Sequence, residues 1–434
     1  MGITTYLKKQ KSRIGKNSGQ VLIITALCLV VLLAFLGLAT DVGYLRFMKQ
    51  ESQKAADAAA MAGALEKISG GDPTAAARYD ASSNGFTHGT NAVNVTVNNP
   101  PLSGPNAGKS SHVELIVQDT APTLFMKVLG KNSAGVSARA VAALTSGPNC
   151  IYALRPDSTG FKMSPGGGYT MQVDCGIVVN SNSSKAADIN DNTLIPVSFG
   201  IRHPGKCVDC GSMEYYNYDG LIPDPLAYLP TPTPTGPCLP DPMILAPGYY
   251  TLPPGNYCNG ITIGTSSGLQ PDVTMSGTYY ITGGQFFVDT PKTDNEDAVP
   301  DHHVNLHGDD VFIYLEPDAT IKMGGGNGKY NNSFGGLHAP TSGTYSGILM
   351  FQDRATPYYR ADVSSGHGDG FSGALYFPSC KLTLRNSNPN NAQYVILVAW
   401  ELEFYRDMVT VGSIGADYST LEYGSPIHSV ALVE

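Results

Sequence analysis

Two neighbouring stretches decide the fold of this chain: VLIITALCLVVLLAFLGLAT at residues 21–40 and QKAADAAAMAGA at residues 53–64. The first is uncharged, and as an α-helix it is about 30 Å long, enough to cross the hydrocarbon layer of a bilayer. Basic residues and no acidic one precede it, which keeps the N-terminus of such a helix in the cytoplasm. We therefore predict a basic cytoplasmic tail over residues 1–18, a transmembrane helix over 19–40 and an extracytoplasmic remainder. The basic residues are Lys8, Lys9, Lys11, Arg13 and Lys16, and the residues that mark the membrane anchor are Val21, Leu29, Leu33 and Phe35.

The sequence leaves three fates open for the N-terminus. A retained anchor is favoured, because the apolar run exceeds the length of about 7–15 residues that is usual in a removable signal peptide. Gly37-Leu38-Ala39 has the small residues of a signal cleavage site, so removal near Thr40 is the second alternative. A prepilin-type cut after Gly19 is the third, although Ile24 stands where that chemistry usually has Glu.

The composition indicates a chain of more than one domain, rich in turns. Of its 434 residues only 15% are charged, whereas Gly and Pro number 49 and 30, a bias that favours short strands over helical bundles. From Asp41 onward 36 acidic residues stand against 22 basic ones, a net charge of −14. Phosphate binding needs clustered Lys and Arg, so this composition excludes nucleic acid as an expected partner.

Seven of the eight cysteines lie in the predicted exported part, where disulfides form. Cys28 lies in the apolar run and is interpreted as a small apolar side chain. Short separations along the chain suggest three disulfides and leave Cys380 free, although spacing alone does not prove connectivity. The alternative for Cys207 and Cys210 is a redox pair or half a zinc site. The suggested pairs are Cys150 with Cys175, Cys207 with Cys210, and Cys238 with Cys258.

Residues 41 to about 68 are predicted to continue the helix out of the membrane as a stalk. Small and apolar residues recur there at helical spacing, which gives one face that another helix can approach closely. This face either packs on its own domain or contacts the N-terminal helix of a partner. The predicted partner-helix face comprises Asp41, Gln53, Ala56, Asp57, Ala59 and Ala62.

The fold class predicted for the exported part is mixed. A small α+β module over residues 41–146 comprises the stalk, a short helix at 74–84, strands at 93–97, 113–117 and 136–144, and a helix at 123–129. Residues 147–434 show short strands between Gly-, Pro- and Asn-rich turns, typical of an all-β domain. We expect a right-handed β-solenoid there, with a β-sandwich as the alternative. A Pro-rich segment over 223–254 interrupts the pattern and is expected to be extended.

The segment 19–66 resembles the N-terminal module of the Flp (tight-adherence) pilus-assembly TadE/TadG-like proteins. The resemblance is carried by Gly19-Gln20, the apolar run, ATDVG at 39–43 and QKAADAAAMAGA at 53–64. YDASSNG and VTVNNPPLSGP in the following module, and GILMFQDR and GALYFPSCKLTL further on, are similar to such proteins more loosely. The resemblance implies a bacterial envelope protein tied to an adhesive pilus machine. The DxSxS metal motif of some large members is absent, so no metal site is carried over.

The residues that could support catalysis lie in unfavourable contexts. The stretch 294–310 is rich in Asp and His, but a solvated loop explains it better than a metal site. GTSSG at 264–268 fits the GxSxG motif of a nucleophile elbow, and GDGFSG at 368–373 fits the GxGxxG motif of dinucleotide-binding proteins. Neither is followed by the helix that its motif requires. A solenoid enzyme acting on polysaccharides would need convergent carboxylates on one face. Its candidate residues are Asp353, Arg354, Asp362, His367 and Asp369.

The predicted function is therefore that of a single-pass component of the bacterial cytoplasmic (inner) membrane, with a structural or assembly role in a Flp/Tad-type pilus or secretion apparatus. Its expected partners are the membrane and pilus-assembly or pilin-like proteins that bind through the N-terminal helix. No enzymatic activity, cofactor or metal is predicted. The alternatives are an adhesin-like module that binds a surface glycan or protein through its many tyrosines, and, less favoured, a polysaccharide-active β-solenoid enzyme.

Overall fold

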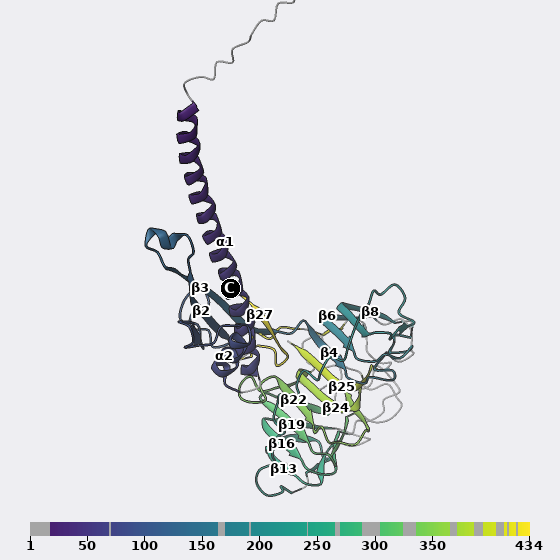
Figure 1. The fold of residues 1–434 in the computed structure, drawn as a ribbon. Helices are drawn as coiled ribbons and strands as arrows, with labels where there is room; N and C mark the ends of the chain where they lie inside the picture. Colours follow the sequence, from purple (N-terminus) through teal and green to yellow (C-terminus); the bar gives the residue numbers. More distant parts are fainter. Residues whose placement is uncertain are drawn as a thin grey trace, which may run out of the picture. The chain divides into compact units, whose positions relative to one another are not determined.

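The computed structural model (Figure 1) describes residues 18–68, 71–163, 170–190, 192–240, 242–264, 270–288, 304–323, 336–364, 371–385, 394–404, 412–414, 416–421 and 424–434. The chain forms two compact units. The first runs through Leu144 and includes Val430–Glu434, and the second comprises Thr145–Ser429. The second unit is therefore inserted, along the chain, between two parts of the first.

A single helix, α1 (Ser18–Ile68), joins the predicted membrane segment to the predicted stalk without a break. Its first half is long and apolar enough to cross a membrane, and only 6% of that apolar window is buried by the rest of the chain. The glycines at 37 and 43 do not interrupt it. An apolar helical surface left bare in this way favours lipid as its surroundings.

The first unit packs helices on one antiparallel sheet. Helix α2 (Pro73–Ser83) begins at Asp72, whose side chain accepts a hydrogen bond from the amide of Thr74 at 2.9 Å. The sheet has the order β1-β2-β3-β27. Its strands are β1 (Asn94–Asn98), β2 (His112–Pro122), β3 (Ser133–Ser146) and β27 (His428–Leu432). Strand β27 comes from the far end of the sequence, and no local pattern predicts where it pairs.

The alanines of the stretch at residues 53–64 form the centre of this unit. Ala55, Ala59 and Ala60 are fully buried against Leu115 and Val117 of the sheet. Small side chains let the helix lie close to the strands, which is why an Ala-rich face suits this position.

The helix predicted at 123–129 is wrong over its first half. Strand β2 runs on to Pro122, and only a single 3₁₀ turn, η1 (Met126–Leu129), forms at the tip of the β2–β3 hairpin. Gly130, at φ 80°, ends the turn in a left-handed conformation that suits glycine. The apolar residues here form a turn because antiparallel pairing of β2 with β3 fixes both ends of the segment.

The second unit is a stack of short parallel strands. Its elements are β4 (Asn149–Ala153), β5 (Phe161–Met163), β6 (Thr170–Val179), β7 (Ala187–Asp188), β8 (Thr193–Arg202), β9 (Cys207–Val208), β10 (Tyr216–Tyr218), β11 (Met243–Ile244), β12 (Gly248–Leu252), β13 (Gly255–Tyr257), β14 (Gly260–Ile263), β15 (Pro271–Met275), β16 (Gly277–Ile281), β17 (Gln285–Val288), β18 (Asn305–Gly308), β19 (Val311–Leu315), β20 (Thr320–Met323), β21 (Gly336–His338), β22 (Ile348–Gln352), β23 (Arg360–Ser364), β24 (Phe371–Arg385), β25 (Val395–Phe404) and β26 (Gly412–Ile414).

From β11 to β21 each strand pairs in parallel with the strand three places further along the chain. The pairs β13–β16, β16–β19 and β19–β22 build one column, β14–β17 and β17–β20 a second, and β12–β15 and β15–β18 a third. This parallel arrangement differs from the antiparallel sheets of the sandwich alternative.

The chain enters this stack in its middle. Strand β4 pairs with β25, the stack then continues through β6 and β8 to β10, and the chain resumes at the opposite end with β11–β13. The intervening segment, described over residues 219–240, crosses the stack, roughly 40 Å at about 4.8 Å per strand. We name it the strap. It contains most of the predicted Pro-rich interruption.

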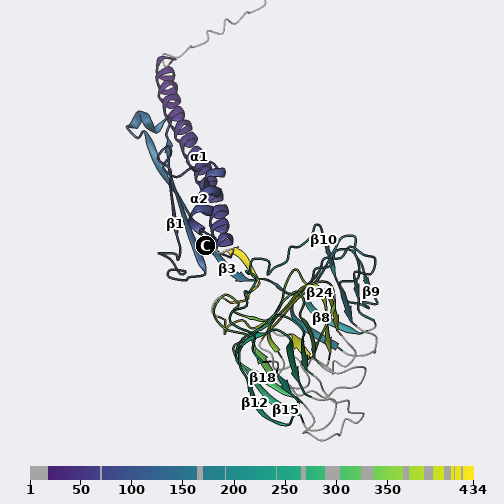
Figure 2. The same ribbon diagram turned by 90° about the horizontal axis from the view of Figure 1, so that it is seen from below.

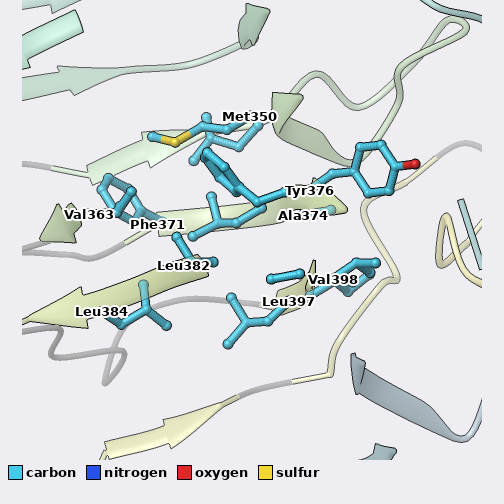
Figure 3. Close-up of a cluster of buried hydrophobic side chains, with 14 of the residues drawn as sticks. Met350, Val363, Phe371, Ala374, Tyr376, Leu382, Leu384, Leu397 and Val398 are labelled. Carbon is cyan, nitrogen blue, oxygen red and sulfur yellow. The ribbon is translucent and has the colours of Figure 1, made fainter. Parts of the chain in front are cut away.

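The interior of the stack is apolar and continuous from strand to strand. Figure 3 shows side chains of successive strands, among them Tyr376 of β24 and Val398 of β25, which are register partners. Both are fully buried. Because parallel in-register pairing places like positions above one another, each strand covers the apolar face of the next.

The described cysteines pair as their spacing suggests. The disulfides are Cys150–Cys175, Cys207–Cys210 and Cys238–Cys258, and Cys380 is free and buried. The Cys207–Cys210 disulfide leaves neither sulfur free for a zinc ion, and it is also the form that an oxidised redox pair would have, so the redox alternative stays a prediction.

Candidate functional site

The first half of α1 presents apolar side chains on all sides. The four residues predicted to mark the anchor are all exposed: Val21 at 61%, Leu29 at 54%, Leu33 at 55% and Phe35 at 67%. A water-soluble helix would cover at least one such face. This surface is the part of the described chain best suited to a membrane.

The second half of α1 buries most of the predicted partner-helix face inside its own unit. Asp41, Ala56 and Ala59 have almost no exposed surface, and Ala62 is half-buried. Gln53 donates to Asp57 at 2.7 Å and to the carbonyl of Arg139 on β3 at 2.9 Å. Of the two arrangements predicted for this face, the structure has the packing on its own domain. A partner contact through these residues stays a prediction.

The side of α1 opposite the sheet is uncovered. Phe47, Met61 and Leu65 are 54%, 40% and 59% exposed, and the Lys54 side chain is 72% exposed. Steps of seven residues from 47 to 54 to 61 keep these positions on one stripe, as in the seam of a coiled coil. We call these four residues the free stripe.

Asp41 connects α1 to the tip of the β2–β3 hairpin. Its carboxylate accepts hydrogen bonds from the amides of Leu124 at 2.8 Å, Phe125 at 2.9 Å and Met126 at 2.6 Å. These are the amides at the start of turn η1, which have no acceptor within the turn. A buried carboxylate needs several donors, and the hairpin supplies them.

Gly37, one helical turn before Asp41, makes room for the same hairpin. A Cβ placed on Gly37 would lie 2.6 Å from the ring of Phe125, whereas one on Gly43 would meet nothing within 4 Å. Gly37 and Asp41 therefore hold the hairpin against α1 by shape and by hydrogen bonds. The sequence predicted a role for Asp41 but none for Gly37 or Phe125.

A buried charge network closes the sheet of the same unit. Glu114 on β2 accepts hydrogen bonds from Asn98 at 2.6 Å, Arg139 at 2.6 Å, Leu102 at 3.1 Å and Ser103 at 3.1 Å. Arg139 also pairs with Glu434, which follows strand β27. Burial alone would raise the pKa of Glu114, but these four donors lower it below its ordinary value.

Three of the five candidates for catalysis lie among the described residues, and each makes separate contacts. Asp353 accepts hydrogen bonds from Tyr314 at 2.6 Å and from the amide of Ala355 at 2.7 Å, so both of its oxygens are engaged. Arg354 points to the strap, and Asp362 pairs with Arg360 at 2.9 Å. His367 and Asp369 lie outside the described residues. So do Asp294–His303 of the acidic stretch and most of the GTSSG string.

The remaining part of the acidic stretch forms separate pairs. His307 contacts Asp272 at 2.8 Å, and His338 contacts Asp309 at 2.7 Å. Over the described ranges, no group of three or more His, Cys, Asp or Glu side chains could hold a metal ion.

An open cavity of about 500 Å³ on the second unit has an aromatic wall. Arg155, Tyr358 and Trp400 line it, together with Thr356, Pro378 and Ser379. Tyr358 is 56% exposed, and Arg155 is paired with Glu401. Some other tyrosines of the chain are structural instead: Tyr279 donates to the Leu252 carbonyl at 2.7 Å and Tyr228 to that of Pro426 at 2.8 Å.

Comparison with known proteins identifies the class of the N-terminal segment. Residues 19–66 match the Tad family model, Flp pilus-assembly TadE/G-like. The match covers the exposed part of α1, Gly37, Asp41 and the buried alanines. The segment is thus similar to the TadE/G-like family, as its resemblance implies. Comparisons with curated proteins and with solved structures gave no match.

Proposed function

We propose that this protein is a single-pass component of the bacterial cytoplasmic membrane with a structural or assembly role in a Flp/Tad-type pilus or secretion apparatus. The TadE/G-like domain at residues 19–66 carries this proposal. The uncovered apolar half of α1 supports it. Residues 1–18 lie in the cytoplasm, and the first unit from Asp41 onward and the second unit lie outside it, following the charge rule for short flanking segments. No enzymatic step is part of the role.

The second unit is, in this proposal, a right-handed β-solenoid. Parallel pairing of strands three places apart, in three columns, supports that architecture. The strap and the Cys238–Cys258 disulfide hold the end of the stack that begins with β11–β13. Such a unit gives the apparatus a stable extracytoplasmic body.

The intact mass of native protein extracted from membranes, measured without reduction, tests the anchoring. An unprocessed N-terminus in the membrane fraction is the expected result. A mature chain that begins near Thr40 and is found in the medium would refute the anchored component. Cleavage after Gly19 would identify a processed, pilin-like subunit instead.

The partner of α1 is expected to be another pilus-assembly or pilin-like helix, bound through the free stripe. Photo-crosslinkers placed at Phe47 and Met61 should join the chain to single-helix proteins of the same apparatus, identified by mass spectrometry. A crosslinker at Tyr79 on α2, which is 78% exposed, is the matched control. Equal crosslinking from all three positions, or none from the stripe, would contradict this contact.

A second candidate function is glycan binding at the cavity beside Trp400. Exposed aromatic rings next to charged hydrogen-bonding groups suit the apolar face and hydroxyls of a sugar. Trp400 is the single Trp of the chain, so its fluorescence reports directly on this cavity. Titration with envelope oligosaccharides should shift that emission saturably, and Tyr358→Ala should abolish the shift whereas Tyr249→Ala, at a 91% exposed position, should not. Trp400 emission that does not change during the titration would refute glycan binding at this cavity.

A further inference from the structure

We propose that the tip of the β2–β3 hairpin, residues 124–129, inserts into the outer leaflet of the membrane beside α1 and forms a second membrane contact. This inference rests on the proposed membrane anchoring of α1. The acyl chains of the lipid bilayer cover the surface around the tip. Figures 1 and 2 both show the hairpin extending alongside the helix.

The tip lies along the apolar part of the helix. Phe125, Met126, Val128 and Leu129 line one side of a groove of about 330 Å³, and Val30, Leu33, Ala34 and Leu38 of α1 line the other. From Val30 to Leu38 the helix rises roughly 12 Å, so the tip reaches into the outer half of the predicted membrane span.

The outward side of the tip is apolar and uncovered. Val128 is 86% exposed, Leu129 81% and Leu124 65%. The apolar surface of α1 next to it is equally bare, and the two form one continuous apolar surface. What surrounds α1 at residues 30–38 must therefore also surround the tip.

Four of the six backbone amides of the tip have acceptors within the protein, as a bilayer requires. Hydrocarbon offers no hydrogen-bond partners, so non-helical backbone is tolerated there only when its polar groups are satisfied internally. Asp41 accepts the amides of Leu124, Phe125 and Met126. Within the turn, Val128 donates to Phe125 at 3.1 Å, Gly130 to Lys127 at 3.0 Å and Lys131 to Met126 at 3.1 Å.

The charged residues of the tip are compatible with this position. Lys127 and Lys131 are the charged side chains between Leu124 and Lys131, and both are exposed. Long lysine stems can follow the apolar surface and place the ammonium group at the lipid headgroups. The single acidic partner of the tip, Asp41, is enclosed by the amides that it binds.

Quenching by brominated lipids tests the insertion on the full chain in vesicles. With Trp400→Phe as background, one Trp is introduced at a time by Val128→Trp, Phe35→Trp or Tyr79→Trp. The emission from Val128→Trp should be blue-shifted and quenched by acyl-chain bromines about as strongly as that from Phe35→Trp. Tyr79→Trp, at a 78% exposed position on α2, should emit as in water and be quenched several-fold less.

The three positions separate the possible failures. Strong quenching at Phe35→Trp with none at Val128→Trp would overturn the insertion and leave the anchor intact. Loss of quenching at both would refute the anchor itself. Adding Asp41→Asn should weaken quenching at Val128→Trp without changing it at Phe35→Trp, and an unchanged value would contradict the role of Asp41. A photo-crosslinker at Val128 in native membranes that labels only protein would assign the tip to a protein partner and refute the lipid contact.

Discussion

At the scale of single residues, Glu114 shows how a buried charge is made tolerable in this chain. Its carboxylate has no exposed surface, yet it faces one guanidinium, one amide side chain, one hydroxyl and one backbone amide. Removing such an acceptor leaves the donors unsatisfied, and this is the costly part of the change. Glu114→Gln keeps the shape but loses the charge.

We predict that Glu114→Gln lowers the free energy of unfolding of the first unit by about 2 kcal/mol. Urea denaturation followed by hydrogen exchange of strands β1 and β2 measures this change. Glu51→Gln is the matched control, because the Glu51–Lys54 pair is exposed and should change stability by less than about 0.5 kcal/mol. Equal effects of the two substitutions would contradict the assigned role of Glu114.

The same residue predicts acid sensitivity. The folded-state pKa of Glu114 lies below its ordinary value of 4.5, so its contribution is complete above pH 4.5 and is lost as pH falls through the lowered pKa. The unfolding midpoint of the first unit should therefore decline below pH 4.5 in the native chain. Glu114→Gln should flatten that decline, and an unchanged pH profile would oppose this assignment.

At the scale of elements, Arg354 of the strand stack makes several of the contacts that hold the strap. Arg354 donates to the carbonyls of Leu226 at 2.9 Å and Leu229 at 3.1 Å, and to the hydroxyl of Tyr376 at 2.7 Å. Its guanidinium also lies over the Tyr376 ring, 5.3 Å from the centroid. A Pro-rich segment has few internal hydrogen bonds, so such contacts decide whether it stays on the surface of the stack.

We predict that Arg354→Ala releases the strap. Chymotrypsin should then cut after Tyr228 much faster than in the native protein, as mapped by mass spectrometry. Arg360→Ala, which changes a 42% exposed guanidinium of the same unit, is the control and should leave the rate nearly unchanged. A strap equally resistant in both variants would show that Arg354 does not hold it.

The contact between α1 and the hairpin gives a second prediction for an element. Gly37→Leu should displace Phe125 and speed hydrogen exchange at the amides of Leu124–Met126. Gly43→Leu introduces the same side chain at a position where a Cβ meets nothing within 4 Å. In that variant, exchange at the amides of Leu124–Met126 should stay slow. Similar exchange in the two variants would mean that Gly37 is not a packing position.

At the scale of the whole molecule, the sequence predicts what is local and periodic. The long helix, the strand-rich second half and the three disulfides follow from apolar periodicity, turn residues and cysteine spacing. The pairing of β27 with the first sheet, the entry of the chain at β4 and the hairpin against Gly37 could not be predicted. They depend on contacts between residues far apart in the sequence, for which spacing carries no signal.

The cysteines give a prediction for the whole chain. Non-reduced peptide mapping should recover the three disulfides and one buried thiol at Cys380. Burial raises the pKa of the Cys380 thiol to about 11, so at neutral pH it should react with iodoacetamide only after unfolding. Rapid alkylation of Cys380 in the native protein would contradict its position in the core.

The insertion of the second unit between β3 and β27 sets the order in which the chain can finish folding during export. The first unit emerges first, but the edge of β3 opposite β2 stays unpaired until residues 428–432 have also crossed the membrane. An open strand edge readily recruits another chain. A chain interrupted before His428 would thus keep the open edge of β3 close to the membrane surface. Copies of this protein would be most crowded there, so a strand of another copy could pair with that edge.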